Sequence, residues 1–406
     1  MTDWVSLDQQ YILPTYNRLP IAIAEARGNT LTDTEGNSYL DLFTGLAVNV
    51  LGHSHPKVLA ALHEQGEQFL HVSNKFLNPP AIELARRLVE NSIQGQVFFS
   101  NSGAEATEAA VKLVHKWTQA EGKGKHGFIV MRKSFHGRTL GAVRLTRQPG
   151  VYQDFPQPDY PVYEVEPNDI DALRELCERE RPAAILAEPI LGSGGVQPLS
   201  TAYLQEIERL CQEKGILCCM DEIQTGIGRT GHLFAYQHAG IQPDLILFAK
   251  GVGGGLPLGG IIAGERTAHL FKPGDHGTTF APSPLSAALG NAVLQVLLED
   301  GGLEEGRRNA EHLWTRLSQL KEKYPSLVQA IRGQGMMIGI HTSLAPKEAS
   351  QLQQTLLTDG FLVDIAQQTV IRLLPPLTLT PQETDRFTNH LAKRLAEIAT
   401  KGGTTP

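Results

Sequence analysis

The pattern of apolar and polar positions changes twice along the chain. Short extended stretches come first: residues 30–33 and 38–43 flank the turn Glu35-Gly36-Asn37, which predicts a β-hairpin. Apolar residues then recur at helical spacing over 56–69 and over 80–89. We therefore expect residues 1–75 to form an N-terminal segment that is separate from the main sheet and belongs partly to a smaller domain.

From about residue 95, short apolar runs alternate with amphipathic helical stretches. The apolar runs are 96–100, 128–131, 183–187, 216–220, 245–249 and 260–263. The helical stretches that separate several of them are 105–119, 169–180 and 203–214. This alternation predicts an α/β fold with a mostly parallel sheet and helices on both faces, and we assign residues 76–300 to this large domain.

The pattern changes again near residue 300. A long apolar helix at 283–298 leads out of the large domain, and a more charged helix follows at 303–324. Strands are predicted at 335–341, 362–365 and 370–374, and a last helix at 381–399. Residues 301–406 are therefore expected to form a small C-terminal α/β domain.

Composition narrows the classes of function. The formal net charge of −7 is spread without long blocks of one sign, which argues against nucleic-acid and membrane partners and favours a small molecule. The four cysteines form no C-x-x-C pair, so no zinc site or disulfide framework is indicated. Cys218 and Cys219 lie in an apolar run and are expected to belong to a buried strand. The start shows no signal-peptide pattern, and no run approaches the ~20 apolar residues of a membrane helix, which predicts a cytoplasmic protein.

Two predicted strands end in groups that can carry chemistry. One apolar run leads into Asp221, and another leads into Lys250. In an open α/β sheet, ligands bind beyond the carboxyl ends of the strands, so both side chains can face one site. A lysine amine can form a Schiff base with an aldehyde cofactor, and a carboxylate can keep a pyridine nitrogen protonated. An ordinary strand-end lysine in an ion pair is the structural alternative.

The same region contains a G-x-G-x-x-G match at 226–231, followed by Asp244. In a dinucleotide-binding fold the first glycine directly follows the strand, and the acidic residue ends the next strand. Here 222–225 intervene, and Asp244 precedes its predicted strand. We therefore expect no dehydrogenase.

Two further segments suit a phosphorylated, ring-shaped ligand. Ser102 and Glu105 have capping-box spacing, and the free amides of Gly103 and Ala104 at this helix start suit a phosphate dianion, although a well-capped helix alone explains the pattern equally. The second segment is 134–139.

In this second segment Phe135 can cover a flat ring, and Arg138 can clamp a substrate carboxylate. Spacing alone assigns neither role. It also leaves open whether His136 packs against the ring or is a loop histidine with ordinary hydrogen bonds.

Taken together, these motifs closely resemble the class III pyridoxal-phosphate aminotransferases. The motifs are NSGAE at 101–105, FHGRT at 135–139, EPI at 188–190, DEIQTG at 221–226, AKG at 249–251, GTTF at 277–280 and RLLPPL at 372–377. Their order and approximate spacing match from about residue 15 to near the C-terminus. Within that class the sequence is most similar to the acetylornithine aminotransferases, including GDHG at 274–277 and GHSHP at 52–56.

The resemblance implies the fold type I architecture, pyridoxal 5′-phosphate as cofactor, and a homodimer with two active sites at the subunit interface. Lys250 is then the cofactor-bearing lysine, while Asp221 and Gln224 contact the pyridine nitrogen and the ring hydroxyl. The remaining residues that it places beside the cofactor are Ser102, Gly103, Ala104, Phe135, His136, Glu188, Ile223 and, from the neighbouring subunit, Thr279. Arg138 and Thr278 bind the amino-acid substrate, and Arg372 binds a carboxylate of glutamate or 2-oxoglutarate.

Two segments depart from the family pattern. The family motif EPIQGEGG reads EPILGSGG here, so Leu191 and Ser193 replace a glutamine and a glutamate. Residues 280–284 read FAPSP where the family tends to have a glycine pair followed by Asn-Pro. In relatives the glutamate pairs with the arginine at position 372, so we expect Arg372 to recruit another partner, an anion or water, and to be more available to dicarboxylates.

The reaction implied is a ping-pong transfer of the terminal amine of N-acetylornithine to 2-oxoglutarate. Ornithine, 4-aminobutyrate or another ω-amine is the main competing donor. An aminomutase or racemase on the same scaffold is a different class and needs no separate acceptor. A non-catalytic binding protein would not require Lys250 in addition to a phosphate site.

Overall fold

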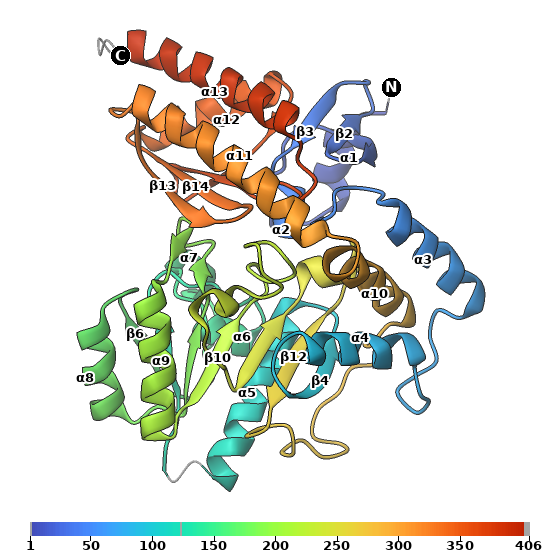
Figure 1. The fold of residues 1–406 in the computed structure, drawn as a ribbon, viewed down its shortest axis with the longest axis vertical. Coiled ribbons are helices and arrows are strands. Elements are labelled where there is room, and N and C mark those ends of the chain that lie inside the picture. The colour runs from blue at the N-terminus through green and yellow to red at the C-terminus, as the bar shows by residue number, and fades with distance from the viewer. Residues whose placement is uncertain (1, 122–123, 402–406) are drawn as a thin grey trace.

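The computed structural model describes residues 2–121 and 124–401, and its largest element is a seven-stranded central sheet (Figure 1). The strands, in sheet order, are β4 (Gly95–Ser100), β12 (Gly259–Gly264), β11 (Leu245–Phe248), β10 (Leu217–Asp221), β7 (Ala184–Ala187), β5 (Phe128–Met131) and β6 (Val162–Val165). β12 runs antiparallel to both neighbours, and every other adjacent pair is parallel. The predicted mostly parallel sheet is confirmed.

Successive residues of the central strands are buried on opposite faces of this sheet. Val130, Leu186 and Cys219 pack with helix α5 (Gly103–Ala120) on one face. Their neighbours Ile129 and Ile185 pack on the other face, with helix α9 (Thr201–Lys214). Both faces are thus apolar, which is why these strands read as continuous apolar runs.

Helices cover the sheet and link it to the rest of the chain. Those on or near the central sheet are α4 (Pro79–Glu90), α6 (Leu140–Leu145), α7 (Pro149–Tyr152), α8 (Ile170–Glu180), α10 (Pro284–Leu298) and the 3₁₀ helices η1 (Ala235–Ala239) and η2 (Lys250–Gly253). Two short strands, β8 (Ile190–Leu191) and β9 (Gln197–Pro198), form a separate ribbon.

The N-terminal segment contains α1 (Trp4–Tyr11), α2 (Thr44–Ala47), α3 (Pro56–Gln68) and the strands β1 (Ile23–Arg27), β2 (Thr30–Asp33) and β3 (Ser38–Asp41). The predicted hairpin is confirmed as β2 and β3. A strand from the far end of the chain, β15 (Phe361–Leu362), pairs in parallel with β3.

The C-terminal sheet has the order β13 (Val328–Gln334), β14 (Met337–Thr342), β17 (Val370–Leu373) and β16 (Asp364–Ala366). Its helices are α11 (Gly302–Lys323), α12 (Pro346–Thr358) and α13 (Pro381–Lys401), and α11 and α13 lie side by side (Figure 1). The single strand predicted at 362–365 is wrong, because the chain leaves one sheet after Leu362 and joins another at Asp364. The domain limits at residues 75 and 300 stay a prediction.

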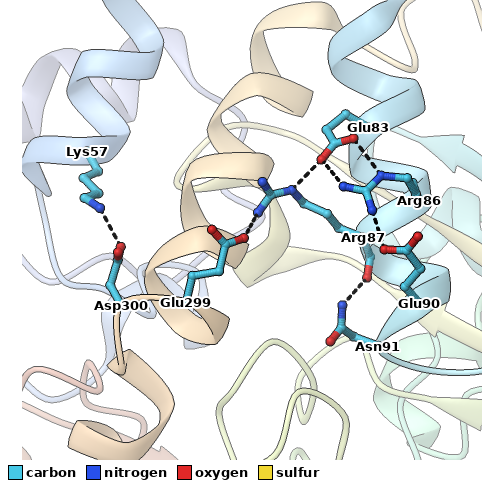
Figure 2. A network of polar contacts seen from close by, with 8 residues as sticks. All are labelled: Lys57, Glu83, Arg86, Arg87, Glu90, Asn91, Glu299 and Asp300. Atoms are coloured by element: carbon cyan, nitrogen blue, oxygen red, sulfur yellow. Dashed lines mark hydrogen bonds and ion pairs between the residues drawn. The ribbon is translucent and has the colours of Figure 1, made fainter.

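Figure 2 shows a polar network on the surface around α3, α4 and the end of α10. Arg87 of α4 binds Glu299 at 2.6 Å, and Lys57 of α3 binds Asp300 at 2.7 Å. Exposed ion pairs of this kind contribute about 0–1 kcal/mol each. The packing of these helices therefore depends mainly on the buried apolar side chains of α4 and α10, such as Leu84, Leu88 and Leu294.

Candidate active site

The carboxyl ends of three parallel strands bring charged side chains to one edge of the central sheet. Asp221 is the last residue of β10, Glu188 directly follows β7, and Lys250 comes two residues after β11. All three line a cavity of about 700 Å³. Every residue that the sequence analysis assigned to the site also lines it, except Thr278 and Thr279.

Lys250 opens the short helix η2 with a left-handed backbone, at a φ of 51°. Such a conformation is uncommon for a residue with a side chain and is found often at functional sites. Desolvation in the cavity, together with the positive charge of Arg372, lowers the pKa of the Lys250 amine to about 8. About a tenth of the amine is therefore neutral and nucleophilic at pH 7, far more than for a lysine of ordinary pKa.

Asp221 is held by two hydrogen bonds. Its Oδ2 lies 2.7 Å from Nδ1 of His136, and its Oδ1 accepts from the backbone N–H of Ile223 at 3.1 Å. Both Asp221 and His136 are buried. His136 therefore has a specific hydrogen-bond partner. Its ring holds the carboxylate of Asp221 in the cavity.

Glu188 positions the loop that carries Phe135. Its Oε1 accepts from the backbone N–H of Phe135 at 2.9 Å, and its Oε2 accepts from that of Gly192 at 3.4 Å. Burial, and to a lesser extent the nearby charge of Asp221, raises the pKa of Glu188 to about 7. The guanidinium of Arg138 lies 5.6 Å from the centre of the Phe135 ring, so the ring and the cation occupy the same side of the cavity.

The start of helix α5 forms another part of the cavity wall. The hydroxyl of Ser102 accepts from the backbone N–H of Glu105 at 3.2 Å, as a helix cap should. The carboxylate of Glu105 turns back to the N–H of Asn101 at 2.6 Å, one residue earlier than in a capping box. Gly103 and Ala104 are the first helical residues, and their N–H groups have no carbonyl partner within the helix. Such a helix start binds anions.

Comparison with known proteins decides the family. The model of the family described as "Aminotransferase class-III" matches residues 11–395. The chain belongs to the class-III aminotransferases. It is 41% identical to the acetylornithine aminotransferase of Caldanaerobacter subterraneus, over 97% of this chain and 99% of that protein.

Two solved structures in this family match over nearly the whole chain. The N-acetylornithine aminotransferase of Stenotrophomonas maltophilia has a TM-score of 0.83 and 31% identity, with coverage of 98% of this chain and 100% of that one. The ornithine aminotransferase of Toxoplasma gondii has a TM-score of 0.92 and 28% identity, with coverage of 98% and 95%. The protein is an aminotransferase dependent on pyridoxal phosphate, which confirms the predicted fold, enzyme class and cofactor.

The cavity of this aminotransferase fits pyridoxal phosphate on several counts. Gly103 leaves room at the helix start, because a Cβ there would lie 2.9 Å from the Ile223 side chain. The Oε1 atom of Gln224 is buried and lacks a hydrogen-bond partner among the residues described, so it is free to accept from a ring hydroxyl. With a carboxylate at Asp221 and an amine at Lys250, each polar group of the cofactor has a complementary group in the wall.

Thr278 and Thr279 lie outside the cavity formed by one chain. The Thr278 hydroxyl accepts from the side-chain amide of Asn101 at 2.9 Å, so it reaches the residue that precedes the helix cap. Its assigned contact with substrate stays a prediction. The assignment of Thr279 to the neighbouring subunit also stays a prediction, because the structure contains one chain.

Arg372 lines the cavity and has a carboxylate partner that the sequence analysis missed. Its Nε and Nη2 atoms lie 2.8 and 2.6 Å from Oδ2 of Asp364. Asp364 stands directly opposite on the neighbouring strand. A strand pair around the turn at 367–369 is the signal that could have revealed this partner. Tyr16, Leu46 and Gln148 also line the cavity, and no motif marks them.

The G-x-G-x-x-G segment has a structural role in this fold. Its central residue, Arg229, is fully buried and donates to the backbone oxygens of Met336, at 3.3 Å, and Pro375. Asp244 precedes β11, as expected, and accepts from the backbone N–H of Cys218 at 2.8 Å. The segment therefore connects the central sheet to the C-terminal part of the chain.

All four cysteines are buried and free, and Cys218 and Cys219 lie within β10. Within the described ranges, 2–121 and 124–401, no group of His, Cys, Asp or Glu side chains is arranged to hold a metal ion. Over the same ranges no helix has both the length and the apolar character needed to cross a membrane.

Proposed function

We propose that this aminotransferase transfers the terminal amino group of N-acetylornithine to 2-oxoglutarate, giving N-acetylglutamate semialdehyde and glutamate, a step of arginine biosynthesis. The observation that carries this proposal is the full-length similarity to acetylornithine aminotransferases at about 40% identity. The cavity supports it, because one amine, Lys250, is accompanied by the guanidinium groups of Arg138 and Arg372. Such a site suits substrates that carry a primary amine and one or two carboxylates.

The cofactor, Asp221 and Lys250 have separate roles in the proposed reaction. Pyridoxal phosphate, when bound, supplies a ring that accepts electrons from the substrate carbon. Asp221, fixed by His136, keeps a proton at the pyridine nitrogen. Lys250 acts as general base and then as general acid, because its amine has a lowered pKa and can take and return a proton near neutral pH.

The reaction runs in two halves at the same site. The amine donor leaves as a carbonyl product, and 2-oxoglutarate then enters and leaves as glutamate. Arg138 orients the donor carboxylate, and Arg372 receives a carboxylate of the dicarboxylate substrate.

We also propose a homodimer, with Thr279 reaching the cofactor phosphate of the neighbouring subunit. Exposed apolar side chains support it: Leu70, Phe76, Leu77 and Phe280 are each more than half exposed. The two segments that carry them are in contact, because the side-chain amide of Asn74 donates to the backbone oxygens of Thr278 and Ala281. An apolar surface of this kind is typical of an interface. The cytoplasmic location stays a prediction.

Ornithine is the second candidate donor, because the ornithine aminotransferase of T. gondii matches this structure with a TM-score of 0.92. A panel of N-acetylornithine, ornithine and 4-aminobutyrate with 2-oxoglutarate separates these donors. We expect N-acetylornithine to give the highest kcat/KM and one glutamate for each donor consumed. A higher kcat/KM for ornithine would contradict the proposed donor, and turnover without 2-oxoglutarate would indicate a mutase or racemase.

A further inference from the structure

The partner of Arg372 is built into the C-terminal sheet. Arg372 on β17 and Asp364 on β16 are paired residues of an antiparallel ladder, so their side chains lie next to each other. Arg372 is 7% exposed, and Asp364 is half-buried. A carboxylate on a neighbouring strand is a fixed partner, because the strand pairing holds it in place whether or not a substrate is bound.

Asp364 binds the edge of the Arg372 guanidinium that carries Nε and Nη2. Nε of Arg372 donates to Oδ2 of Asp364 at 2.8 Å, and Nη2 forms an ion pair with the same oxygen at 2.6 Å. Nη1 is buried and has no hydrogen-bond partner in the described part of the chain. Arg372 lines the cavity, so its charge acts on a substrate carboxylate there while Asp364 stays bound.

The other carboxylates that line the cavity, Asp221 and Glu188, are bound to His136 and to backbone N–H groups. Ser193 lines the cavity but is neutral, and its backbone oxygen accepts from the side chain of Gln367 at 2.8 Å. Lys250 carries a positive charge when protonated, and the charge of Arg372 disfavours that state. Asp364 is thus the carboxylate that compensates Arg372 in this structure.

We propose that Asp364 is a specificity-determining residue for the two substrates of this enzyme. This inference rests on the proposed function, in which a dicarboxylate and a donor use one cavity in turn. With Asp364 in place, the buried charge of Arg372 stays paired even when the bound donor has no carboxylate for it. A dicarboxylate must bind an arginine that already forms an ion pair with Asp364. The affinity of the enzyme for dicarboxylates is therefore limited. The sequence analysis expected Arg372 to be more available to dicarboxylates; with Asp364 as its partner, we infer the opposite.

The test uses Asp364→Asn in the cofactor-loaded enzyme, with glutarate as a non-reacting dicarboxylate. Asparagine keeps an oxygen that can accept from Nε but removes the negative charge. Glutarate should bind on the order of tenfold more tightly in isothermal titration, because one nearby negative charge is lost. The KM for 2-oxoglutarate should fall by a similar factor while kcat stays within about twofold, as expected when only the binding of one substrate changes.

Asp359→Asn is the matched control, because Asp359 binds Arg394 at 2.6 Å in the same part of the chain without lining the cavity. It should leave glutarate binding unchanged. Asp364→Ser provides a second neutral variant and should also tighten glutarate binding if Asp364→Asn folds poorly. Glutarate binding that is unchanged or weaker in the neutral variants would overturn the inference and make Asp364 a residue that only positions Arg372. If the wild-type enzyme neither binds glutarate nor uses 2-oxoglutarate, the proposed function itself is wrong as well.

Discussion

The amine of Lys250 is expected to control how fast the enzyme takes up its cofactor. Only the neutral amine attacks an aldehyde, and the pKa of Lys250 is lowered to about 8. Below this pH the capture rate of pyridoxal phosphate by the apoprotein should rise about tenfold per pH unit, and above it the rate should level off. Stopped-flow absorbance over pH 6–10 measures this. A rate that keeps rising to pH 10 would show that the lysine has an ordinary pKa.

Asp221 is expected to act through its charge, since His136 and the Ile223 amide hold its carboxylate in place. Asp221→Asn should retain some cofactor yet lose about two to four orders of magnitude in kcat, or roughly 3–5 kcal/mol of barrier. Asp244→Asn is a suitable control, because Asp244 does not line the cavity and forms its own ion pair with Arg266, at 2.9 Å. Turnover of Asp221→Asn at the parental rate would refute the role of Asp221 at the pyridine nitrogen.

Ser193 tests whether a second carboxylate changes the behaviour of Arg372. Ser193→Glu would place another negative group in the cavity wall, so 2-oxoglutarate should bind more weakly, while the half-reaction with N-acetylornithine is spared or improved. Single-turnover spectroscopy measures each half separately. Two unchanged half-reactions, or intact 2-oxoglutarate binding in Arg372→Ala, would mean that Arg372 is structural.

At the residue scale, the sequence could identify the groups that follow strands. Asp221, Glu188 and Lys250 meet because the carboxyl ends of parallel strands share one edge of the sheet. The pair of Arg372 and Asp364 was missed, because it depends on the strand pairing around the turn at 367–369, which neither residue reveals alone. The contact between His136 and Asp221 was also missed, since 85 residues separate them in the sequence.

Elements with continuous apolar sequence were predicted within one or two residues. β5 and β7 are buried at every position, so their apolar runs mark their ends clearly. β6 and β13 were not predicted, because most of their residues are only partly buried and their sequences mix polar with apolar positions. Helix α12 was also missed, since only Ala349, Leu352 and Leu356 are buried in it.

Arg229 is expected to stabilise the junction between the central sheet and the C-terminal part of the chain. Arg229→Ala leaves the backbone oxygens of Met336 and Pro375 buried without this donor. The free energy of unfolding should fall by about 2–5 kcal/mol, as measured by chemical denaturation. Arg308→Ala is the control, because the Arg308 side chain is exposed, and it should change the free energy by less than about 0.5 kcal/mol. Equal stability of both variants would contradict this role.

At the scale of the whole molecule, the apolar surface around Phe76, Leu77 and Phe280 is expected to hold two chains together. Sedimentation velocity should give about twice the chain mass of 44.3 kDa for the wild type. The double substitution Leu77→Asp and Phe280→Asp should give a monomer with little activity, because two charges cannot be buried unpaired in an interface. Phe155→Asp alters another exposed apolar residue and should leave the mass unchanged. A wild-type monomer with full activity would contradict the proposed dimer.

Lys250 is the residue on which the proposed active site depends most, because it is expected to carry the cofactor. Reduction of the purified enzyme with borohydride makes the bond between a lysine and pyridoxal phosphate permanent, and digestion followed by mass spectrometry locates the labelled peptide. The label is expected on the peptide that contains Lys250, because this amine lines the cavity with Asp221 and has a pKa lowered to about 8. A label on any other lysine, or none on Lys250, would contradict the active site described above.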